Sequence, residues 1–587
     1  MEDCLPINLM KMMKIKLILF ISFLGASCLR AQKEDNVWVF GYRYSFLPLA
    51  NGIYFKFGDS LNILYGSKPM STDNSNASIC DSNGVLQFIS NGCYIETGNG
   101  EYVNNSSGLN PGWLYNEECI DDSLGYPNLQ SMVFLPSSGD PNLYYLFHIP
   151  LKVVFQPTLD AYNNALLYTI VETAGNGAVL EKNMVVVSDT LHPDGLASVR
   201  HANGRDWWII VAKYRSNKYY TVLLTPDGIS VKEQNIGESA MANAGGEIVF
   251  SPDGTKMARF NCKDDLRIFD FDRCTGVLSK PVYIPIQDNA DNEIFAGLAF
   301  SADGHYLYAA EIKRMLQFDM WAPDIASSMV IVAERDLNTT CNLGKAIGYL
   351  ELGPDGMIYC RPLNGQSCMH RMKHPERAGA AAEFVQYYYE FDFSYKNLPH
   401  FPNFRLGPVD GSPCDTLGLD NHPLAGWRYD KTEGLSVDFT SVSWYEPDTW
   451  WWDFGDGAQS NERNPTHTFP APGAYEVCLS VSNEYGTDTK CKWVWLNTSG
   501  IKPLSSGEGL GVRLFPNPST GQIFWTGLED QPVTILVYNQ LGQKMAHYHT
   551  AENSIDLSAL TDGMYHIQIV SSAQILLLSR SIMINRD

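Results

Sequence analysis

Short apolar runs joined by Asp-Gly recur along the first part of the chain. The sequence Phe-Ser-Pro-Asp-Gly ends at Gly254, and related sequences end at Gly304 and Gly356, at intervals of about fifty residues. An apolar run lies on each side of every copy, and Asp and Gly both tolerate the positive φ of a tight turn. Each copy therefore predicts a β-hairpin. A hairpin repeated at this interval is typical of the blades of a β-propeller.

Weaker copies of the hairpin pattern extend toward the N-terminus. Their turns fall at Asn83-Gly84, Ser138-Gly139 and Asn203-Gly204. With the three clear copies they predict an all-β propeller over residues 33–408. We expect about seven blades, with six or eight as the alternatives.

The N-terminal strands and a late aromatic run are the candidates for the seventh blade. Trp38 to Phe40 and Gly52 to Phe55 are short apolar runs, and Phe384 to Phe393 is rich in Tyr and Phe. Pairing of these segments would close the ring and remove open sheet edges. The region opens with Trp38 to Gly41 and ends with Leu398 to Phe404, and it resembles a family of exported bacterial propeller proteins. That resemblance implies no particular chemistry.

Residues 1–31 have the pattern of a secretory signal peptide. Lysines precede the apolar run Leu17 to Leu24, and small residues lead to a cleavage site after Ala31. A membrane anchor would need about 20 apolar residues, more than this run has. A lipoprotein signal at Cys28 is disfavoured because Gly25 stands where Leu is usual. We expect export and no transmembrane segment after cleavage.

Composition favours a secreted, β-rich protein of several domains. The chain has 31 Tyr, 27 Phe and 13 Trp but only 18% charged residues, a balance typical of β-sheet proteins. Its 65 acidic residues exceed its 42 basic residues, which gives a formal net charge of −23. A nucleic-acid binder needs a basic surface, and no Lys/Arg cluster occurs, so nucleic acid is not an expected partner.

A linker composition over residues 409–423 separates the propeller from a second domain, residues 424–498. Its central motif, Trp-Trp-Trp-Asp-Phe-Gly-Asp-Gly, runs from Trp450 to Gly457. Trp452 and Phe454 alternate toward a core, and the final Asp-Gly would turn a hairpin. This segment resembles a PKD domain, an immunoglobulin-like β-sandwich.

The resemblance to PKD domains implies structural roles for most of the motif. In that family these residues form turns and core, and the modules space domains or bind proteins and glycans without catalysis. A calcium pair at Asp453 and Asp456 is a weaker alternative, and no cofactor is otherwise predicted. The motif residues are Trp452, Asp453, Phe454, Gly455, Asp456, Gly457, His467, Pro472, Gly473 and Tyr475.

Cysteine usage fits an exported protein. Of the 13 cysteines, Cys4 and Cys28 leave with the signal, so an odd number remains and at least one is free or paired elsewhere. In the PKD sandwich Cys478 and Cys491 fall on neighbouring antiparallel strands, which predicts a disulfide. No Cys-x-x-Cys occurs, which disfavours zinc. Two further pairs flank hairpins and could each bridge a blade: Cys80 with Cys93, and Cys262 with Cys274.

The end of the chain carries a third pattern. After a short linker, residues 499–509, residues 510–587 carry three motifs in order, Leu514 to Gly521, Val537 to Gln543 and Ile555 to Tyr565. With these motifs the segment resembles the type A C-terminal sorting domain of the Por (type IX) secretion system. The ending departs from the family, because Ser579-Arg580-Ser581 replaces its Lys-rich final strand. The resemblance implies the type IX machinery as a partner and a location outside the cell or on the outer-membrane surface. The motif residues are Pro516, Asn517, Pro518, Gly521, Tyr538, Gly542, Gly563 and Tyr565.

We find no catalytic motif. Neither Gly-x-Ser-x-Gly, His-Glu-x-x-His nor a phosphate-binding Gly-rich loop is present. Three groups of residues have a functional alternative to a structural role. These are His370 with His374 as metal ligands, Asp288, Asp291 and Glu293 as a calcium loop, and Trp207, Trp208 and Trp321 as sugar-stacking rings.

The sequence therefore favours a non-catalytic binding protein at the cell surface, with the propeller as recognition domain and the PKD module as spacer or interaction module. Its ligand would be an extracellular glycan or protein. A propeller glycosidase or lyase is the alternative, and it would need two carboxyl groups about 5 to 9.5 Å apart in the channel. A structural adhesin or gliding component is the third.

Overall fold

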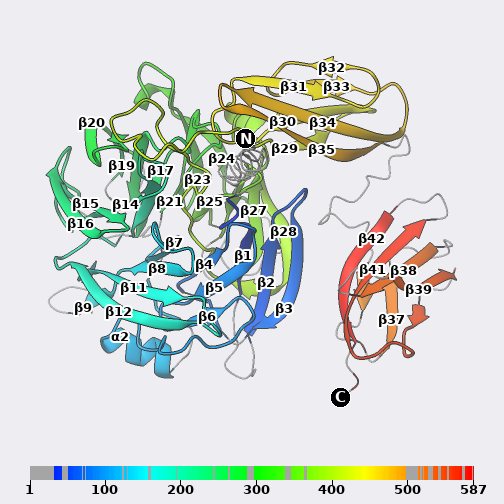
Figure 1. Cartoon of the computed structure of the whole chain (residues 1–587), viewed down its shortest axis with the longest axis horizontal. Coiled ribbons are helices and arrows are strands. Elements are labelled where there is room, and N and C mark those ends of the chain that lie inside the picture. Colours follow the sequence, from blue (N-terminus) through cyan, green and yellow to red (C-terminus); the bar gives the residue numbers. More distant parts are fainter. Residues whose placement is uncertain are drawn as a thin grey trace, which may run out of the picture.

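Seven small antiparallel sheets are arranged around one axis in the computed structural model, and two β-sandwiches follow them (Figure 1). The structure describes residues 32–586 apart from 42–49, 69, 73, 122–124, 129, 156–159, 194, 242–244, 262, 264, 287–295, 338–345, 363–365, 497–512, 516–518, 520, 527–532, 540–543, 551–553, 572–575 and 585. The predicted signal peptide lies outside the described residues. The fold is all-β, and its first part is the predicted propeller.

Within the described residues each sheet is one blade, and the first two blades have three strands whereas the others have four. The strands, blade by blade, are β1 (Val37–Phe40), β2 (Ala50–Lys56) and β3 (Asn62–Lys68); β4 (Ala77–Cys80), β5 (Leu86–Ser90) and β6 (Ile95–Thr97); β7 (Met132–Pro136), β8 (Leu143–His148), β11 (Leu166–Glu172) and β12 (Ala178–Val187); β13 (Ala197–Arg200), β14 (Trp207–Ala212), β15 (Lys218–Thr225) and β16 (Gly228–Asn235); β17 (Gly246–Phe250), β18 (Lys256–Asn261), β19 (Asp265–Asp272) and β20 (Val277–Ile284); β21 (Ala296–Phe300), β22 (Tyr306–Glu311), β23 (Arg314–Asp319) and β24 (Val330–Glu334); β25 (Leu350–Leu352), β26 (Ile358–Cys360), β27 (Gln366–Met372) and β28 (Phe384–Tyr395).

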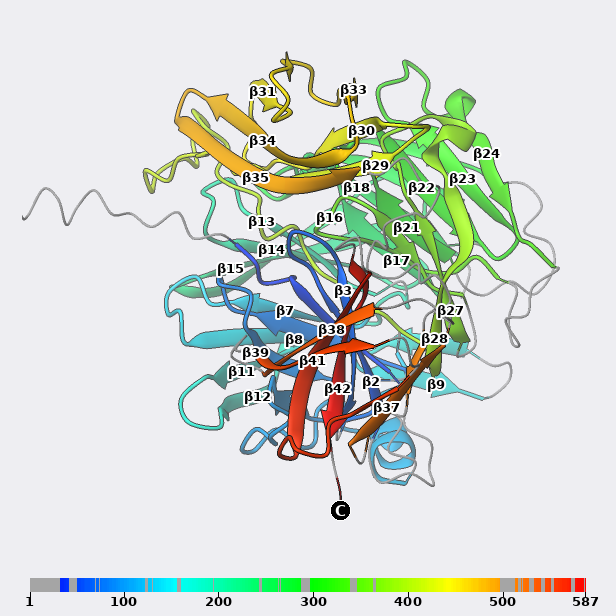
Figure 2. The ribbon, with the colours of Figure 1, turned by 90° about the vertical axis from the view of Figure 1, so that its right-hand side faces the viewer.

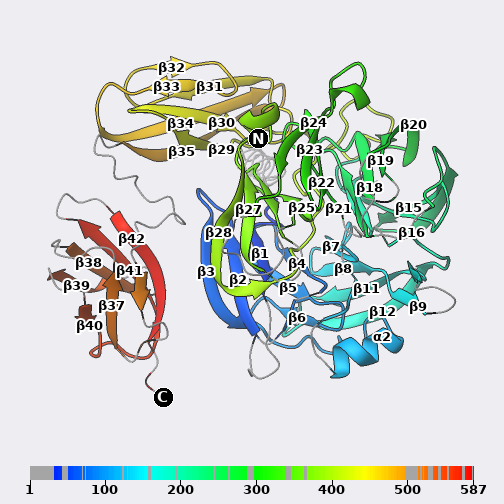
Figure 3. The same ribbon diagram turned by 180° about the vertical axis from the view of Figure 1, so that it is seen from behind.

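Short elements lie between the blade strands. The hairpin of β9 (Leu151–Val154) and β10 (Asp160–Asn163) leaves the third blade, and α2 (Trp113–Tyr115) with the π-helix Asn116–Asp121 precedes that blade. Two 3-10 turns, Ala326–Ser328 and Gly379–Ala382, complete the set. Figures 1 and 3 show α2 on the far side of the propeller from the first sandwich.

The Asp-Gly turns form the hairpins that the sequence predicts. Gly254 and Gly304 both have a φ of 71°, a left-handed conformation that favours glycine. In the first of these turns Gly254 N donates to Ser251 O (2.8 Å), while the Ser251 hydroxyl donates to Asp253 Oδ1 (2.5 Å). Local side-chain chemistry therefore sets each turn before any blade packs.

The ring is closed by side-chain packing. Neighbouring blades share buried apolar clusters around the whole circle. In the cluster that joins the first blade to the last, the Trp38 and Tyr359 rings meet edge to face with centroids 5.3 Å apart. The predicted pairing of Phe384 to Phe393 with the N-terminal strands is wrong. β28 pairs with β27, and β1 pairs with β2, so these strands have other partners.

The first sandwich has an aromatic core between two sheets. One sheet holds β29 (Trp427–Lys431), β30 (Ser436–Ser441) and β33 (Thr466–Thr468), and the other holds β32 (Gln459–Ser460), β31 (Thr449–Asp453), β34 (Gly473–Asn483) and β35 (Gly486–Leu496). Trp427 and Trp452 pack edge to face at 5.5 Å, and both are fully buried. The alternation that the sequence predicts for Trp452 and Phe454 thus builds this core.

The second sandwich also has two sheets around a core of branched apolar residues. One sheet contains β36 (Arg513–Phe515), β37 (Gln522–Thr526) and β40 (Ser554–Asp556); the other contains β39 (Lys544–Thr550), β38 (Val533–Asn539), β41 (Gly563–Ser571) and β42 (Leu576–Ile584). Alternating buried residues on β38 and β41 face this core, as expected for half-buried strands.

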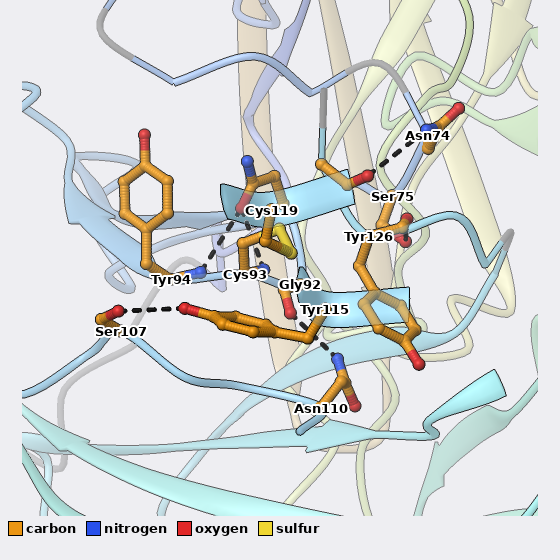
Figure 4. Close-up of a disulfide and its surroundings, with 12 residues drawn as sticks. Asn74, Ser75, Gly92, Cys93, Tyr94, Ser107, Asn110, Tyr115, Cys119 and Tyr126 are labelled. Atoms are coloured by element: carbon orange, nitrogen blue, oxygen red, sulfur yellow. Dashed lines mark hydrogen bonds between the residues drawn. A yellow bond between two sulfur atoms is a disulfide. The ribbon is translucent and has the colours of Figure 1, made fainter. Parts of the chain in front are cut away.

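The disulfides differ in part from the sequence-based pairs. Cys478 and Cys491 are bonded and lie directly opposite each other on β34 and β35, as predicted. Cys93 is bonded to Cys119 of the π-helix, so the Cys80–Cys93 pair is wrong (Figure 4). Cys80 is free and buried, because it pairs with Leu86 at the start of β5 whereas Cys93 lies beyond the end of that strand.

The second predicted blade disulfide is wrong as well. Cys274 is bonded to Cys414, which ties residues 140 positions apart, and Cys262 lies outside the described residues. Cys368 is also disulfide-bonded, and Cys360 is free and buried. The Cys274–Cys414 bond joins a blade turn to the predicted linker, a contact that spacing within one hairpin cannot indicate.

We predict that replacing Cys478 and Cys491 together with Ser destabilises the β34–β35 hairpin by about 3 kcal/mol, because the cross-link constrains the unfolded chain. Hydrogen exchange of these strands in the full protein measures the loss. The matched control is Ser480→Ala with Thr489→Ala, the next pair on the same face, which should change exchange little. Equal exchange in both variants would contradict the prediction.

Candidate functional site

The chain leaves the last blade through a segment that runs along the propeller axis. This channel segment, residues 397–408, follows β28 and contains no strand. At its start Asn397 Nδ2 donates to Asn74 O (3.0 Å). Further on, Asn403 Nδ2 donates to Pro252 O in an Asp-Gly turn (2.6 Å). The segment therefore crosses from one face of the ring to the other.

The channel segment takes the place of an inner strand in the first blade. β1 runs antiparallel to β4 of the next blade, because Cys80 N donates to Glu34 O and the Asn76 amide donates to Val39 O. β1 therefore corresponds to the second strand of a four-stranded blade, and within the described residues no strand lies on its inner side. The channel segment runs antiparallel to β1 and lies in that position.

Two aromatic rings anchor the segment on opposite sides of the axis. Phe401 stacks on Trp38 of the first blade, with ring centroids 5.9 Å apart. Phe404 is fully buried and meets Trp207 of the fourth blade edge to face at 5.6 Å. The segment therefore fills the channel as well as completing one blade.

A buried polar cluster surrounds the first half of the channel segment, around His400. His400 Nδ1 lies 3.2 Å from both Gln130 Nε2 and Glu351 Oε2. Glu351 also accepts a hydrogen bond from Phe401 N (3.3 Å), so its carboxylate holds the segment at two points. These residues come from different blades, and His400 brings them together.

The two carboxyl groups of this region have structural partners. Glu247 Oε2 accepts hydrogen bonds from the backbone N–H groups of Leu298 (2.5 Å) and Leu350 (3.5 Å). Burial raises the pKa of both Glu247 and Glu351, for Glu247 well above its usual range. Both side chains are covered by protein, so they join neighbouring blades and do not face an open channel.

A buried ion pair holds the second half of the channel segment, at Arg405. Both Arg405 Nη atoms contact the Asp35 carboxylate, at 2.7 and 2.5 Å, and Nη2 also donates to Asn36 Oδ1 (2.9 Å). Burial opposes the charge of Arg405, yet the Asp35 carboxylate raises the pKa of the guanidinium above its usual value. Bidentate geometry of this kind gives both strength and direction.

Two further arginines bind the segment through its carbonyl groups. Arg200 Nη2 donates to Phe404 O (3.1 Å), and its guanidinium lies over the Trp207 ring at 4.0 Å. Arg273 Nη2 donates to Gly407 O, and burial lowers the pKa of Arg273 to about 10. Beside them, burial raises the pKa of Glu34 to about 7 despite the nearby Arg200 charge.

The space that remains in the channel is small. A cavity of about 90 Å³ lies between the inner strands and the channel segment, and Trp444 of the PKD-like sandwich lines it next to Arg405. A second cavity, of about 20 Å³, lies beside Glu247, Glu351 and His400. Sites for organic ligands measure about 300–1,000 Å³, so these cavities suit only a few waters.

One turn of the PKD-like sandwich lies at the Arg405 end of the channel, and Figure 2 shows the sandwich strands β29 to β35 above the propeller. Trp444 lies under the Arg405 guanidinium at 5.2 Å. The next two residues, Tyr445 and Glu446, have φ values of 62° and 51°, a strained backbone for residues other than glycine. Asn483 Nδ2 donates to Tyr445 O (2.9 Å) and supports this turn.

Ion pairs link the same sandwich to the propeller rim. Arg428 Nη2 lies 2.9 Å from Glu376 Oε2, and Arg377 Nη2 lies 3.2 Å from Asp438 Oδ2. On the first blade, Lys490 Nζ lies 2.6 Å from Asp59 Oδ1. The predicted linker, residues 409–423, is tied to the fifth blade through the Cys274–Cys414 bond.

The PKD motif residues form turns and core. Asp453 Oδ1 accepts from Gly455 N and Asp456 Oδ1 from Ala458 N, both at 2.9 Å. Asp456 Oδ2 lies 2.8 Å from His467 Nε2, and this contact lowers the pKa of Asp456 against the effect of burial. The carboxylates are thus used by the turn itself.

The rest of the motif has comparable roles. His467 stacks on Phe454 at 4.1 Å, and Tyr475 donates from its hydroxyl to Ala471 O (2.8 Å) just before Pro472 and Gly473. The backbone at Gly455 and Gly457 has positive φ. In the described part of the chain, no group of three or more His, Cys, Asp or Glu side chains is placed to hold a metal ion.

Half of the sorting motif can be placed. Gly521 has a φ of 120° and lies against Ser558, so a side chain here would be strained. Tyr565 donates from its hydroxyl to Thr561 O (2.9 Å), while Tyr538 and Gly563 lie on β38 and β41. Pro516, Asn517, Pro518 and Gly542 lie outside the described residues.

The tryptophan, histidine and acidic-loop candidates from the sequence differ in burial and position. Trp207 and Trp208 are buried between blades, whereas Trp321 is 65% exposed. His370 lies on strand β27, where burial lowers its pKa to about 4, so it does not share a helical face with His374. The acidic loop Asp288, Asp291 and Glu293 lies outside the described residues.

Sequence reasoning missed the groups that organise the channel. Glu247, Glu351 and Arg405 carry no recognisable motif, because their partners come from distant blades. The only signal was the Leu398 to Phe404 run, which the sequence marks as a boundary without a role.

We predict that Glu34→Gln stabilises the protein at pH 8 and has little effect at pH 4.5. The pKa of Glu34 rises on folding from its ordinary value of 4.5 to about 7. The folded state therefore holds the proton more tightly, and this stability is complete below pH 4.5 and lost as the pH rises through 7. The gain at pH 8 is about 3 kcal/mol. Urea unfolding at both pH values tests this, with exposed Glu117→Gln as control; a pH-independent effect would contradict it.

We predict that Arg405→Met destabilises the propeller by about 3–5 kcal/mol, since it leaves the buried Asp35 carboxylate without its partner. Adding Asp35→Asn should recover part of the loss. Arg463→Met, at an exposed arginine of the PKD-like sandwich, is the matched control. Denaturant unfolding gives the free energies, and hydrogen exchange in residues 397–408 locates them. A loss below about 1 kcal/mol would show that the pair is dispensable.

Two family models match the chain. A PKD domain matches residues 423–495, and a secretion system C-terminal sorting domain matches residues 513–585. The described residues include no helix that is both long and apolar enough to cross a membrane.

Solved structures resemble separate parts of the chain. The PKD1 domain of Vibrio anguillarum Epp is 31% identical, covering 13% of this chain and 95% of its own, with a TM-score of 0.13. The PKD1 domain of the Vibrio cholerae metalloprotease PrtV is 33% identical over 13% and 99%, with a TM-score of 0.13. A protein from Lactobacillus plantarum is 13% identical over 62% and 97%, with a TM-score of 0.38.

The matched tail directs proteins outward through type IX secretion, to the cell surface or the medium. The chain therefore carries a PKD domain and a secretion system C-terminal sorting domain after a seven-bladed β-propeller.

Proposed function

We propose that this exported protein is a non-catalytic binding protein whose propeller surface recognises an extracellular glycan or protein. The observation that carries the proposal is the filled channel. Residues 397–408 occupy the axis, where an enzyme of this shape would hold its substrate, and the cavities left beside them measure about 90 and 20 Å³. Recognition then uses the outer surface of the ring.

The carboxyl groups of the channel support the same proposal. A glycosidase needs two carboxyl groups that flank a bound sugar. Glu247 and Glu351 are instead covered and engaged by backbone N–H groups and by His400. They hold blades and the channel segment together, a structural task that leaves no room for substrate.

In this proposal the PKD domain braces the propeller. Its turn at Trp444 closes the Arg405 end of the channel, and its ion pairs reach two separate blades. Two domains joined in this way present one rigid body to a ligand. A rigid binding surface loses less conformational entropy on association than a mobile one.

A binding screen of the full secreted protein tests the proposal. We expect retention on a glycan array or capture of a defined surface protein, with no release of reducing ends or unsaturated sugars from any bound glycan. Glu351→Gln, which alters a channel carboxyl, should leave binding unchanged. Hydrolysis or elimination products that disappear in the Glu351→Gln variant would overturn the non-catalytic assignment.

We predict that deleting residues 510–587 traps a folded protein in the periplasm. The sorting domain is the feature that the exporter reads, and the propeller and PKD domain have cores of their own. Cell fractionation and disulfide mapping check location and folding. Fusing residues 510–587 to a periplasmic reporter should send the reporter out in the same strain. Normal surface levels of the truncated protein would contradict the prediction.

A further inference from the structure

The sixth blade carries an exposed tryptophan that stacks on a histidine ring. Trp321 follows β23 and is the most exposed tryptophan of the described residues, at 65%. Its ring lies parallel to that of His305, with centroids 3.8 Å apart and an interplanar angle of 12°. His305 in turn stacks on Tyr306 at 4.0 Å. One face of the indole is therefore covered by a stack, and the ring is left to present its other face.

Hydrogen bonds hold this stack in place. Asp319 Oδ1 accepts from Trp321 N (2.9 Å) and also lies 3.1 Å from His305 Nε2. Met320 N donates to His305 O (2.8 Å), which ties the loop to the neighbouring hairpin turn. A single carboxylate thus bonds to the Trp321 backbone and to the His305 ring, and 36% of the Asp319 side chain is exposed.

Core packing does not account for this arrangement. Trp207 and Trp208 are buried between blades, as tryptophan of a structural role usually is. Leaving an indole in water gives up a large hydrophobic gain, and such exposed aromatic rings mark binding surfaces. The support by His305 reduces the entropy that ligand binding would otherwise cost.

We propose that Trp321 is a stacking platform for a neutral glycan. The apolar C–H face of a pyranose ring matches one flat indole face, and the partly exposed Asp319 carboxylate of the same loop can accept a hydroxyl hydrogen bond. The net charge of −23 disfavours anionic polysaccharides, which leaves neutral ones as the ligand class. This proposal rests on the binding function above and places its site.

The location suits a polymer. The loop that carries Trp321 leaves β23 beside the Asp-Gly turn at Gly304, on the end of the ring that the PKD domain covers. Figures 1 and 2 show β23 and β24 on the same side of the propeller as the PKD strands. Because Trp321 is exposed, a chain bound on it would lie outside the filled channel.

Affinity electrophoresis and intrinsic fluorescence of the full secreted protein test the site. The probes are hexaoses of cellulose, xylan, mannan and chitin, with polygalacturonate as the anionic arm. We expect binding of at least one neutral hexaose and a loss of at least ten-fold in affinity for Trp321→Ala. Trp113→Ala is the matched control, because that exposed ring meets Phe155 edge to face and should not matter.

Two His305 variants distinguish loss of the stacking support under Trp321 from a general loss of structure. His305→Ala should weaken binding several-fold, whereas His305→Phe, which keeps a stacking ring, should retain it. Equal binding by wild type and Trp321→Ala would overturn the site but leave the binding function standing. Capture of a protein with no neutral hexaose bound would overturn the ligand class alone. Absence of any glycan or protein ligand would contradict both proposals.

Discussion

The buried ion pair between Arg405 and Asp35 is the contact on which the position of the channel segment in the closed ring depends. It joins residues 370 positions apart, one just before the first strand and one after the last blade. Both side chains are buried, so either charge would be costly without the other. The pair therefore holds the first blade and the channel segment together, and the described residues form no backbone ladder between the two.

Closure by an irregular segment also decides where function can reside. A regular inner strand would keep its side chains between blades and leave the axis open. Phe401 and Phe404 instead reach blades on opposite sides of the axis, and His400 bridges buried groups of two more. The channel thereby becomes part of the core.

The same interaction extends into the PKD domain. The Arg405 guanidinium lies over Trp444, and the Cys274–Cys414 bond ties the connecting residues to a blade turn. Disulfides of this kind form in the oxidising compartments that an exported chain passes through. Propeller and PKD domain are thus joined by a covalent bond as well as by packing.

The sequence by itself determined the elements of this protein. The turns at Gly254 and Gly304, the alternation around Trp452 and the Cys478–Cys491 bond depend on residues close together along the chain. Their chemistry acts before distant segments meet. Tertiary structure decided the closure of the ring, the remaining disulfides and the exposure of Trp321, because these depend on which blades become neighbours. No local pattern records that Arg405 will meet Asp35, since the shape of the whole ring brings the two charges together.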